Sequence, residues 1–594
     1  MWRHVLSHRR ATWLLALLGM LLILPTLNVG LLADDFFVRE LLTGQAHYAH
    51  PGAFFGLFTF ADGQPAHVQL LKDMGQVPWW VADNAQLSFW RPLSELTHWL
   101  DYQLWPHSPA LMHLHSVLWY GLLVWLLGRL YHMLDPDTVR SNVATLIFAV
   151  SSQHLLTVTW LAARNQLIAG CFILLTIMCF HLWRQGKGSR YGGLALLTSA
   201  LGLMCAEAGI ASFAYLGAYA LVYESDKPWA PRLKALLPFV ITVVIWRVTY
   251  THLGYGSSGS GGYIDPASDP VRFAQTLLLR IPTLLLAQLY GVPSSALNTL
   301  TYPAQLLYAS SAGVAVVLSM LVGQYFGLWS TRLARFYGVG ALLALIPVCA
   351  ALPNDRLLLN AEFGLSALLA MLFVKVLPRR HLYTGKLATA AQLLVAVLMT
   401  VHLLIYPLAT PVVSALMRQL VRVPAHDEPL SIPDAGPHSQ DQVILVNPPN
   451  ALFVGYYPVV RRYFGVHNAK STQALASGDQ ALTLTVLDER RISLSAPNGI
   501  GENVSRDFSK LPFKVGDSVR AGHFVATVMA VTPLGKAKTA QFAFDTPLRQ
   551  QPWHLFVWGE NGYEPFVLPA IGQSLTLPPV NIGKLVGKRI KSSF

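Results

Sequence analysis

The sequence predicts a polytopic α-helical membrane protein with about 11 transmembrane helices, followed by a C-terminal mostly-β soluble domain. The 594 residues are 53% hydrophobic and only 12% charged, whereas soluble globular proteins carry about 25% charged residues. Apolar stretches of roughly twenty residues recur through the first two thirds of the chain, and each is long enough to cross a hydrocarbon core of ~30 Å. Beyond about residue 424, shorter alternating patterns typical of strands replace them.

The first apolar stretch is predicted to be a retained helix. Ala11 to Leu32 is longer than the apolar part of a usual signal peptide, and no A-x-A-like cleavage site follows it. The same hydropathy pattern predicts the other spans. The predicted helices are residues 11–32, 109–133, 141–160, 166–183, 191–206, 208–223, 235–253, 304–328, 336–352, 357–377 and 386–407.

Basic residues mark every second loop between these helices, for example Arg184, Lys187 and Arg190. Loops of this kind face the cytoplasm, so the N-terminus is predicted inside and the C-terminal domain outside. The same scatter over short loops explains the net charge of +13 without a nucleic-acid partner. All four cysteines lie in apolar segments, so we expect neither a disulfide framework nor a metal-binding cysteine pair.

Two long outer segments interrupt the predicted transmembrane domain, residues 1–423. Residues 33–108 contain apolar patches too short to span, such as "PWW" at 78–80, and interfacial helices lying on the membrane are typical of such patterns. Residues 254–303 begin with the Gly/Ser-rich "GYGSSGSGGY", which favours a flexible segment. An amphipathic helix is expected after it. A mobile lid over a site and a plain linker are both compatible with this segment.

Residues 424–594 are predicted to form the extracytoplasmic mostly-β domain. Strands are expected in "ALTLTVLDERRISLS" (481–495), with a hairpin turn at 488–491, and in "HFVATVMAV" (523–531). "DQVILVNPPN" (441–450) predicts a buried strand, and a short helix is expected around 451–464. The basic tail "GKLVGKRIKSSF" suits contact with anionic headgroups or simple solvation.

Ionisable residues gather on the predicted outer side near membrane depth, where they are costly and usually functional. Singly, each has a structural explanation, such as solvation at a helix end. Because all fall on one side, we expect a shared cavity at the membrane surface. These residues are Asp34, Asp35, Arg91, Glu95, His98, Asp101, His113, His154, Arg164, Glu207, Asp355 and Arg356. Asp34 and Asp35 are adjacent, and their mutual repulsion is expected to raise the pKa of one of them.

Several of these residues stand in short motifs. The motifs are "ADDFF" after the first helix, "WRPL" (90–93), His113, His154 with Arg164–Asn165, Glu207, and "DRLLLNAEFG" (355–364). Their order over about residues 1–380 resembles the GT-C superfamily of integral-membrane glycosyltransferases. Within it, the branch containing protein O-mannosyltransferases and their tetratricopeptide-carrying relatives is most similar.

This sequence also departs from that family pattern. Trp90 stands where the family has Tyr, Leu155 where it has Pro, Ser116 where it has Asn, and Ala206 where it has Lys. The missing Lys removes one cation that could hold donor phosphate. No tetratricopeptide repeats follow the apolar helices.

The resemblance implies transfer of a sugar from a polyprenyl-phosphate-linked donor to an acceptor protein, glycan or lipid, with inversion at the anomeric carbon. A hydroxyl acceptor benefits from a general base. We assign Asp35 to this role and Asp34 to a helper or acceptor-binding role, with the reverse order left open.

Fixed cations are expected to stabilise the leaving phosphate, because guanidinium groups bind phosphate bidentately. Arg91, Arg164 and Arg356 are the candidates. His154 is assigned to phosphate or sugar, and Glu207 to orienting an arginine. Some relatives place divalent ions near such acids, but no HExxH-like spacing supports a metal here, so no cofactor is assigned.

Two functions from other classes stay open. A lipid or polysaccharide transporter would also have many spans, and a non-catalytic scaffold of an envelope glycan assembly complex would leave Asp34 and Asp35 replaceable. A lipid A or arabinose transferase is a close alternative within the superfamily. A bacterial inner membrane is the expected location, with an endoplasmic reticulum membrane as the alternative.

Overall fold

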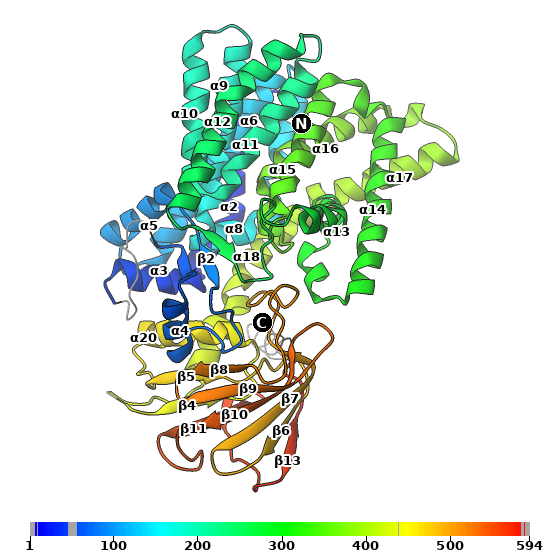
Figure 1. Ribbon diagram of the computed structural model, residues 1–594. Helices are drawn as coiled ribbons and strands as arrows, with labels where there is room; N and C mark the ends of the chain where they lie inside the picture. The colour runs from blue at the N-terminus through cyan, green and yellow to red at the C-terminus, as the bar shows by residue number, and fades with distance from the viewer. Residues whose placement is uncertain are drawn as a thin grey trace. The chain divides into compact units, whose positions relative to one another are not determined.

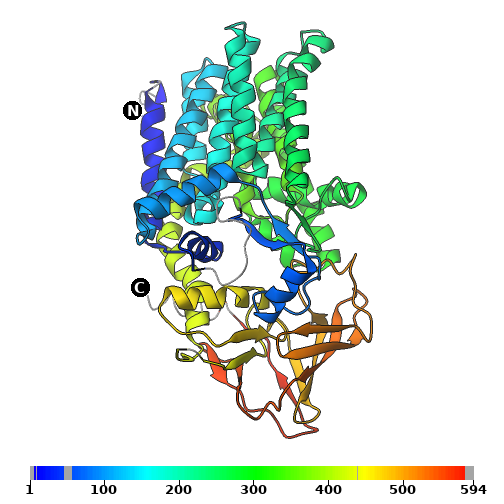
Figure 2. The ribbon, with the colours of Figure 1, turned by 60° about the vertical axis from the view of Figure 1, so that its left-hand side comes forward.

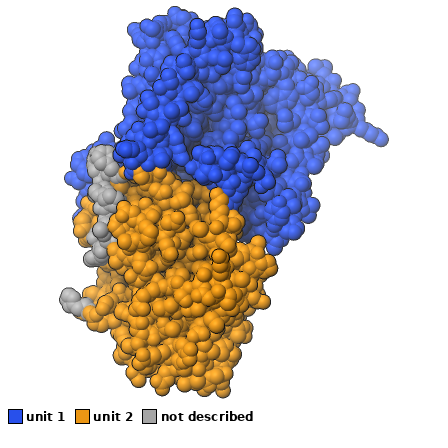
Figure 3. Space-filling model, viewed as in Figure 1, with its two compact units in different colours: residues 1–30, 90–253, 264–415 blue, residues 31–89, 254–263, 416–594 orange. Residues whose placement is uncertain are grey.

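The computed structural model describes residues 6–8, 10–45, 56–437, 439–581, 583 and 587. The chain forms two compact units, each built from separate stretches of sequence (Figure 3). The first unit comprises residues 1–30, 90–253 and 264–415, and the second comprises residues 31–89, 254–263 and 416–594. Most of the basic tail expected to touch headgroups lies outside the described residues.

The first unit is helical, and many of its long helices run alongside one another (Figures 1 and 2). Its main helices are α2 (Ala11–Ile23), α5 (Pro92–Leu104), α6 (Pro109–Leu134), α7 (Thr138–Ala149), α8 (Leu155–Thr159), α9 (Arg164–Arg184), α10 (Ser189–Cys205), α11 (Ala211–Ala218), α12 (Trp229–His252), α13 (Pro270–Tyr290), α14 (Tyr302–Tyr325), α15 (Arg332–Val348), α16 (Leu359–Val376) and α17 (Lys386–Thr400). Helix α18 (Tyr406–Arg422) begins in this unit.

Eight helical stretches among the described residues are long and apolar enough to cross a membrane, which indicates an integral membrane protein. They are Ala11–Asn28, Pro109–Leu134, Leu161–Arg184, Trp229–His252, Pro270–Tyr290, Tyr302–Tyr325, Asp355–Leu382 and Lys386–Arg422. The expected count of eleven is not confirmed.

One expected helix differs from the sequence prediction. The span expected at 141–160 ends at Ala149, and two short helical segments, η2 (Ser152–His154) and α8, follow it. The polar "SSQH" stretch interrupts the apolar run at this point. Helix α13 occupies the position of the expected amphipathic helix, and it is also long and apolar enough to span a membrane. Figure 1 shows α13 nearly end-on, across the direction of α9 and α10.

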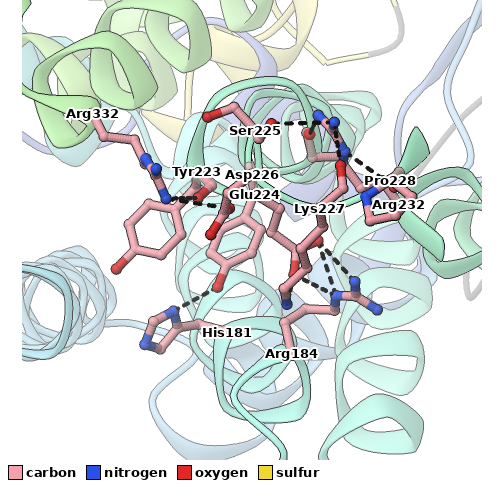
Figure 4. A network of polar contacts seen from close by, with 12 residues as sticks. His181, Arg184, Tyr223, Glu224, Ser225, Asp226, Lys227, Pro228, Arg232 and Arg332 are labelled. Carbon is pink, nitrogen blue, oxygen red and sulfur yellow. Dashed lines mark hydrogen bonds and ion pairs between the residues drawn. The ribbon is translucent and has the colours of Figure 1, made fainter.

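Charged residues of loops that are predicted to be cytoplasmic form a network of ion pairs and hydrogen bonds (Figure 4). The Glu224 carboxylate accepts hydrogen bonds from Arg184 at 2.9 Å and from Lys227 at 2.6 Å. Arg232 donates to the backbone carbonyls of Ala220 and Lys227, and Arg332 donates to Asp226 at 3.3 Å. These charges hold the turn before α12 in place, and we assign them a structural role.

The described part of the second unit forms three sheets. The strands are β1 (Thr59–Asp62), β2 (Gln86–Ser88), β3 (Gly256–Ser258), β4 (Gln442–Leu445), β5 (Ser471–Ala474), β6 (Leu482–Val486), β7 (Arg491–Ile500), β8 (Ser518–Ala521), β9 (Phe524–Val531), β10 (Ala537–Phe544), β11 (Trp553–Trp558), β12 (Tyr563–Pro565) and β13 (Ser574–Leu577). An antiparallel six-stranded sheet has the order β13-β6-β7-β10-β9-β8, and a four-stranded sheet has the order β12-β11-β4-β5. In the latter, β4 is parallel to both β11 and β5.

The strand predictions for this region are confirmed. β6 and β7 pair as an antiparallel hairpin, with Val486 opposite Ile492. Their apolar side chains alternate toward the core, as period-2 patterns require. The buried strand is β4, and the helix expected at 451–464 is η12 (Ala451–Tyr456) continued by α20 (Tyr457–Tyr463).

The structure corrects the interpretation of the "PWW" segment. Trp79 and Trp80 are fully buried in the same apolar core as the strands of the C-terminal region. The indole Nε1 of Trp79 donates to the Leu475 carbonyl at 3.0 Å, and that of Trp80 donates to Ser505 Oγ at 2.9 Å. These rings therefore do not lie at a membrane interface.

The neighbouring residues of this segment also pack tightly against the C-terminal strands. Gly75 has a φ of +71°, and a Cβ at this position would lie 1.9 Å from the Thr472 carbonyl oxygen. Only glycine permits both this backbone conformation and this approach. Trp79 and Trp80 thus belong to the core of the second unit, and Gly75 packs closely against β5.

The Gly/Ser-rich segment is also more ordered than its composition predicts. Gly256–Ser258 form β3, which pairs with β2, and the Gly261 amide donates to the Asn503 carbonyl at 2.7 Å. The expectation of a flexible stretch is wrong for these residues, because backbone pairing supplies the order that their small side chains cannot.

A buried acid predicts a pH-dependent stability of the second unit. Glu428 is 2% exposed and accepts a hydrogen bond from the Tyr457 hydroxyl at 2.7 Å. Burial raises its pKa from 4.5 to about 7 despite this bond. Stability that is fully present below pH 4.5 is therefore lost as the pH rises through about 7. We expect a lower melting temperature at pH 8 than at pH 5.

Substitution tests this assignment. Glu428→Gln should flatten the pH dependence of thermal unfolding measured on the β-sheet signal, whereas Glu564→Gln, at an exposed position on β12, should retain it. A Glu428→Gln protein with the pH profile of the wild type would contradict the assignment.

Candidate active site

The acid pair begins helix α3 (Asp34–Leu42) in the second unit. Asp35 is 3% exposed, and its Oδ2 accepts a hydrogen bond from the Leu32 amide at 3.0 Å. Asp34 is partly exposed, and its Oδ1 accepts a 2.6 Å hydrogen bond from the Tyr456 hydroxyl. The helix N-terminus favours negative charge at both positions. The two carboxylates therefore have different surroundings.

The residue before the pair has an unusual backbone conformation. Ala33 has φ 38° and ψ −108°, and is the non-glycine residue with positive φ among those described. Such conformations cost about 1–3 kcal/mol and persist where surrounding contacts enforce them. Here the Asp35 and Phe36 amides donate to the Leu32 and Ala33 carbonyls. The strain fixes the direction in which α3 leaves the preceding turn.

Arg91 and Glu207 form an ion pair in the first unit. Arg91 directly precedes α5, and Glu207 begins the short turn η4 (Glu207–Ile210) after α10. The guanidinium Nε and Nη2 both contact Glu207 Oε2, at 3.0 and 2.7 Å. The side chains are 14% and 32% exposed. Glu207 thus pairs with an arginine whose side chain remains partly exposed.

Arg164 lies in a buried network at the start of α9. Its Nη1 donates to Asp101 Oδ2 at 2.5 Å, its Nε to Ser116 Oγ at 2.9 Å, and its Nη2 to the Met112 carbonyl at 2.7 Å. The side chain is fully buried. His115 Nδ1 contacts the other Asp101 oxygen at 2.7 Å. This arginine ties α5, α6 and α9 together.

Two groups on α5 have perturbed pKa values. Burial, helped by the positive charge of Arg164, lowers the pKa of His98 to about 3. Burial alone would raise the pKa of Asp101, but the hydrogen bond from His115 and the charge of Arg164 outweigh it and lower this pKa. Near neutral pH, His98 is uncharged and Asp101 is ionised. The network therefore contains one matched Arg–Asp pair, as burial of charge requires.

His154 pairs with an acid that the sequence analysis missed. His154 Nε2 lies 2.9 Å from Glu362 Oε2 on α16, and both side chains are buried. The Tyr120 hydroxyl lies 3.2 Å from His154 Nδ1. An acid within an apolar helix is itself a signal of function, and this signal could have identified Glu362.

Arg356 lies in the turn η8 (Asp355–Leu358), close to the segment that carries His154. Its guanidinium stacks over the Trp160 ring at 4.7 Å, and the Thr157 hydroxyl donates to its backbone carbonyl at 3.2 Å. The Asp355 carboxylate accepts hydrogen bonds from the Ser294 amide and hydroxyl. The Arg356 side chain is partly exposed.

The first unit brings together several predicted site residues. The segment 152–164, which follows α7 and ends at the first residue of α9, carries His154, Trp160 and Arg164. The Trp160 ring is the one on which Arg356 stacks. Asp34 and Asp35 belong to the second unit, so the approach of the acids to these cations stays a prediction. Among the described residues, no three His, Cys, Asp or Glu side chains form a metal-binding group.

Comparison with known proteins gives a partial match. No protein-family model matches the sequence. The chain is similar to "Protein O-mannosyl-transferase Tmtc1" of Drosophila melanogaster, with 25% identity over 205 residues, which cover 34% of this chain and 21% of that protein. The chain thus spans about a fifth of the length of the curated relative that it matches. This similarity supports a glycosyltransferase-like function.

Proposed function

We propose that this protein is a GT-C-type membrane glycosyltransferase, which moves a sugar from a polyprenyl-phosphate donor to an acceptor hydroxyl on the extracytoplasmic face. The observation that carries the proposal is the Arg91–Glu207 pair. An accessible guanidinium held by an acid is suited to bind phosphate in a fixed direction. The similarity to an O-mannosyl-transferase supports it. A bacterial inner membrane is the proposed location, with the C-terminal region in the periplasm.

The proposed reaction is a direct displacement at the anomeric carbon. The acceptor oxygen forms a bond to this carbon while the bond to the phosphate oxygen breaks, and the bonding electrons leave with the polyprenyl phosphate. The acceptor proton passes to a carboxylate, and the configuration inverts. The base removes a proton, and the cations stabilise the developing phosphate charge.

The geometry favours a change in the assigned roles of the acids. Asp35 is buried, and its carboxylate accepts a hydrogen bond from the Leu32 amide, which ties the start of α3 to the preceding turn. Asp34 is partly exposed, and a general base must reach the acceptor proton. We therefore propose Asp34 as the base and Asp35 as the residue that holds its helix, the order that the sequence left open.

The cations divide in the same way. Arg91 and Arg356 are partly accessible, and we propose that they bind the donor phosphate. Arg164 is fully buried, with donors engaged by Asp101, Ser116 and Met112. His154 is buried against Glu362. We propose that Arg164 and His154 do not touch the donor. They hold in place the helical segments next to Arg91 and Arg356.

A transfer assay tests the function. The purified full-length protein in lipid vesicles would be given a panel of radiolabelled polyprenyl-phosphate sugars with peptide, glycan and lipid acceptors. We expect Arg91→Ala to lower kcat/KM for the donor by about 10²-fold, because one fixed charge at the leaving phosphate is lost. Arg91→Lys should recover only part of this, since an ammonium group cannot bind phosphate bidentately.

A matched control separates this effect from a general loss of charge. Arg332→Ala removes an exposed arginine paired with Asp226 and should leave kcat/KM unchanged. Donor movement across vesicles without product would favour the transporter, and a wild type that consumes no donor would favour the scaffold. Equal rates for Arg91→Ala and the wild type would contradict the proposed clamp.

A further inference from the structure

Tyr456 joins the C-terminal part of the chain to the acid pair. It ends η12, and its hydroxyl lies 2.6 Å from Asp34 Oδ1. The Tyr456 ring packs against the ring of Phe37, which also lies on α3, and the two ring centroids are 5.0 Å apart. Both elements belong to the second unit. One side chain thus contacts both the proposed base and the helix that carries it.

Helix α3 is docked on η12 and α20 by further contacts. Arg462 on α20 binds Glu40 bidentately, with both hydrogen bonds at 2.6 Å. The Glu40 side chain is 1% exposed. The rings of Tyr463 and Phe36 pack edge-on, with their centroids 5.4 Å apart. The guanidinium carbon of Arg39 lies over the Tyr463 ring, 5.2 Å from its centroid. These contacts fix α3, so the Tyr456 hydroxyl meets Asp34 in a defined geometry.

The direction of this hydrogen bond follows from the charges. Burial, together with the negative charge of Asp34, raises the pKa of Tyr456 well above 10, so the hydroxyl stays protonated and donates. The other charged groups on α3 are Asp35, Arg39 and Glu40. On α20, Arg461 donates to the backbone carbonyls of Pro429 and Ile432, and Arg462 is bound to Glu40. Tyr263 is a further titratable neighbour of Tyr456.

We infer that Tyr456 is a positioning residue for the catalytic carboxylate. Its hydroxyl holds the Asp34 carboxylate in one orientation, from which the carboxylate takes the acceptor proton. This inference rests on the proposed function. It assigns the C-terminal region a part in the transfer reaction, because the group that orients the base comes from η12, more than 400 residues along the chain. Glycosyl transfer then depends on the folded second unit.

Tyr456→Phe removes the hydroxyl and keeps the ring contact with Phe37. A hydrogen bond to a carboxylate stabilises its charged form and lowers its pKa, so losing it raises the pKa of Asp34. We expect kcat to fall about tenfold, because the base loses its fixed orientation. We also expect the acid limb of the kcat profile to move up by about one pH unit. KM for the donor should stay unchanged, since Tyr456 is not proposed to touch it.

Tyr463→Phe is the matched control. It removes a hydroxyl from the same helical region, and its ring packs against Phe36 of the same helix. Its pH profile should match that of the wild type. Hydrogen exchange of α3 in all three full-length proteins establishes that the fold is retained.

The outcomes separate the inference from the function on which it rests. A wild type that consumes no donor from the panel overturns the transferase and the role of Tyr456 together. An active wild type whose Tyr456→Phe variant has the same kcat and the same acid limb overturns the inference alone. A fall in kcat with an unmoved acid limb and a raised KM also overturns it, because that pattern indicates a general loss of structure.

Discussion

Asp34→Asn is expected to lower kcat for sugar transfer by about 10²–10⁴-fold, the usual effect of losing a general base. Asparagine has nearly the same size, and its amide oxygen can still accept the Tyr456 hydrogen bond, so α3 should keep its position. What it lacks is the ability to take a proton near neutral pH. KM for the donor should change little, because the proposed phosphate contacts are made by arginines.

Asp35→Asn is the matched variant. An asparagine oxygen can still accept from the Leu32 amide, as Asp35 Oδ2 does at 3.0 Å, so we expect kcat within about tenfold of the wild type, well short of the loss from removing a general base. Single-turnover assays with excess enzyme would measure the chemical step for both. If Asp35→Asn loses transfer while Asp34→Asn retains it, Asp35 is the base and the order inferred from exposure is wrong.

Trp79→Ala is expected to have the largest effect on stability. The Trp79 side chain is fully buried, and its ring packs against those of Trp80, Phe513 and Phe542 at 5.6–5.7 Å. Truncating a buried Trp to Ala costs about 3–5 kcal/mol. It also leaves the Leu475 carbonyl without its indole donor. The destabilisation should appear in the β-strands of the C-terminal region, because Trp79 is part of their core.

Hydrogen exchange in the full-length protein can measure this effect strand by strand. Faster exchange is expected in β7 and β10 of the Trp79→Ala protein, with the first unit unchanged. Leu534→Ala, at a position that is 71% exposed, should change the free energy of unfolding by less than about 0.5 kcal/mol. Wild-type protection of β10 in Trp79→Ala would contradict the shared core.

Local sequence patterns predicted the helices and strands better than they predicted which segments pack together. The alternation in 481–495 predicted β6 and β7, because a strand with one buried face has an apolar residue at every second position. The same reasoning failed for "PWW" and "GYGSSGSGGY". An indole that is buried and one at a membrane interface have the same sequence signature, and a Gly/Ser segment becomes a strand only when a neighbour such as β2 pairs with it.

The candidate site shows the same division. The motifs identified Arg91, Glu207, His154 and Arg164 as polar residues at helix ends, and the structure pairs the first two with each other. The sequence could not show that Arg164 binds Asp101 or that His154 contacts Glu362. The first pair is separated by 63 residues along the chain and the second by 208. Whether a cation is accessible depends on such partners and not on its own motif.

The sequence by itself determined that the chain is an apolar, helical membrane protein with a β-rich C-terminal region, because hydropathy and period are local properties. Only the tertiary structure decided that Trp79 and Trp80 share a core with that region, and that Asp34 is the more accessible acid and contacts Tyr456. Burial and hydrogen bonding between distant segments follow from packing, which no local pattern encodes.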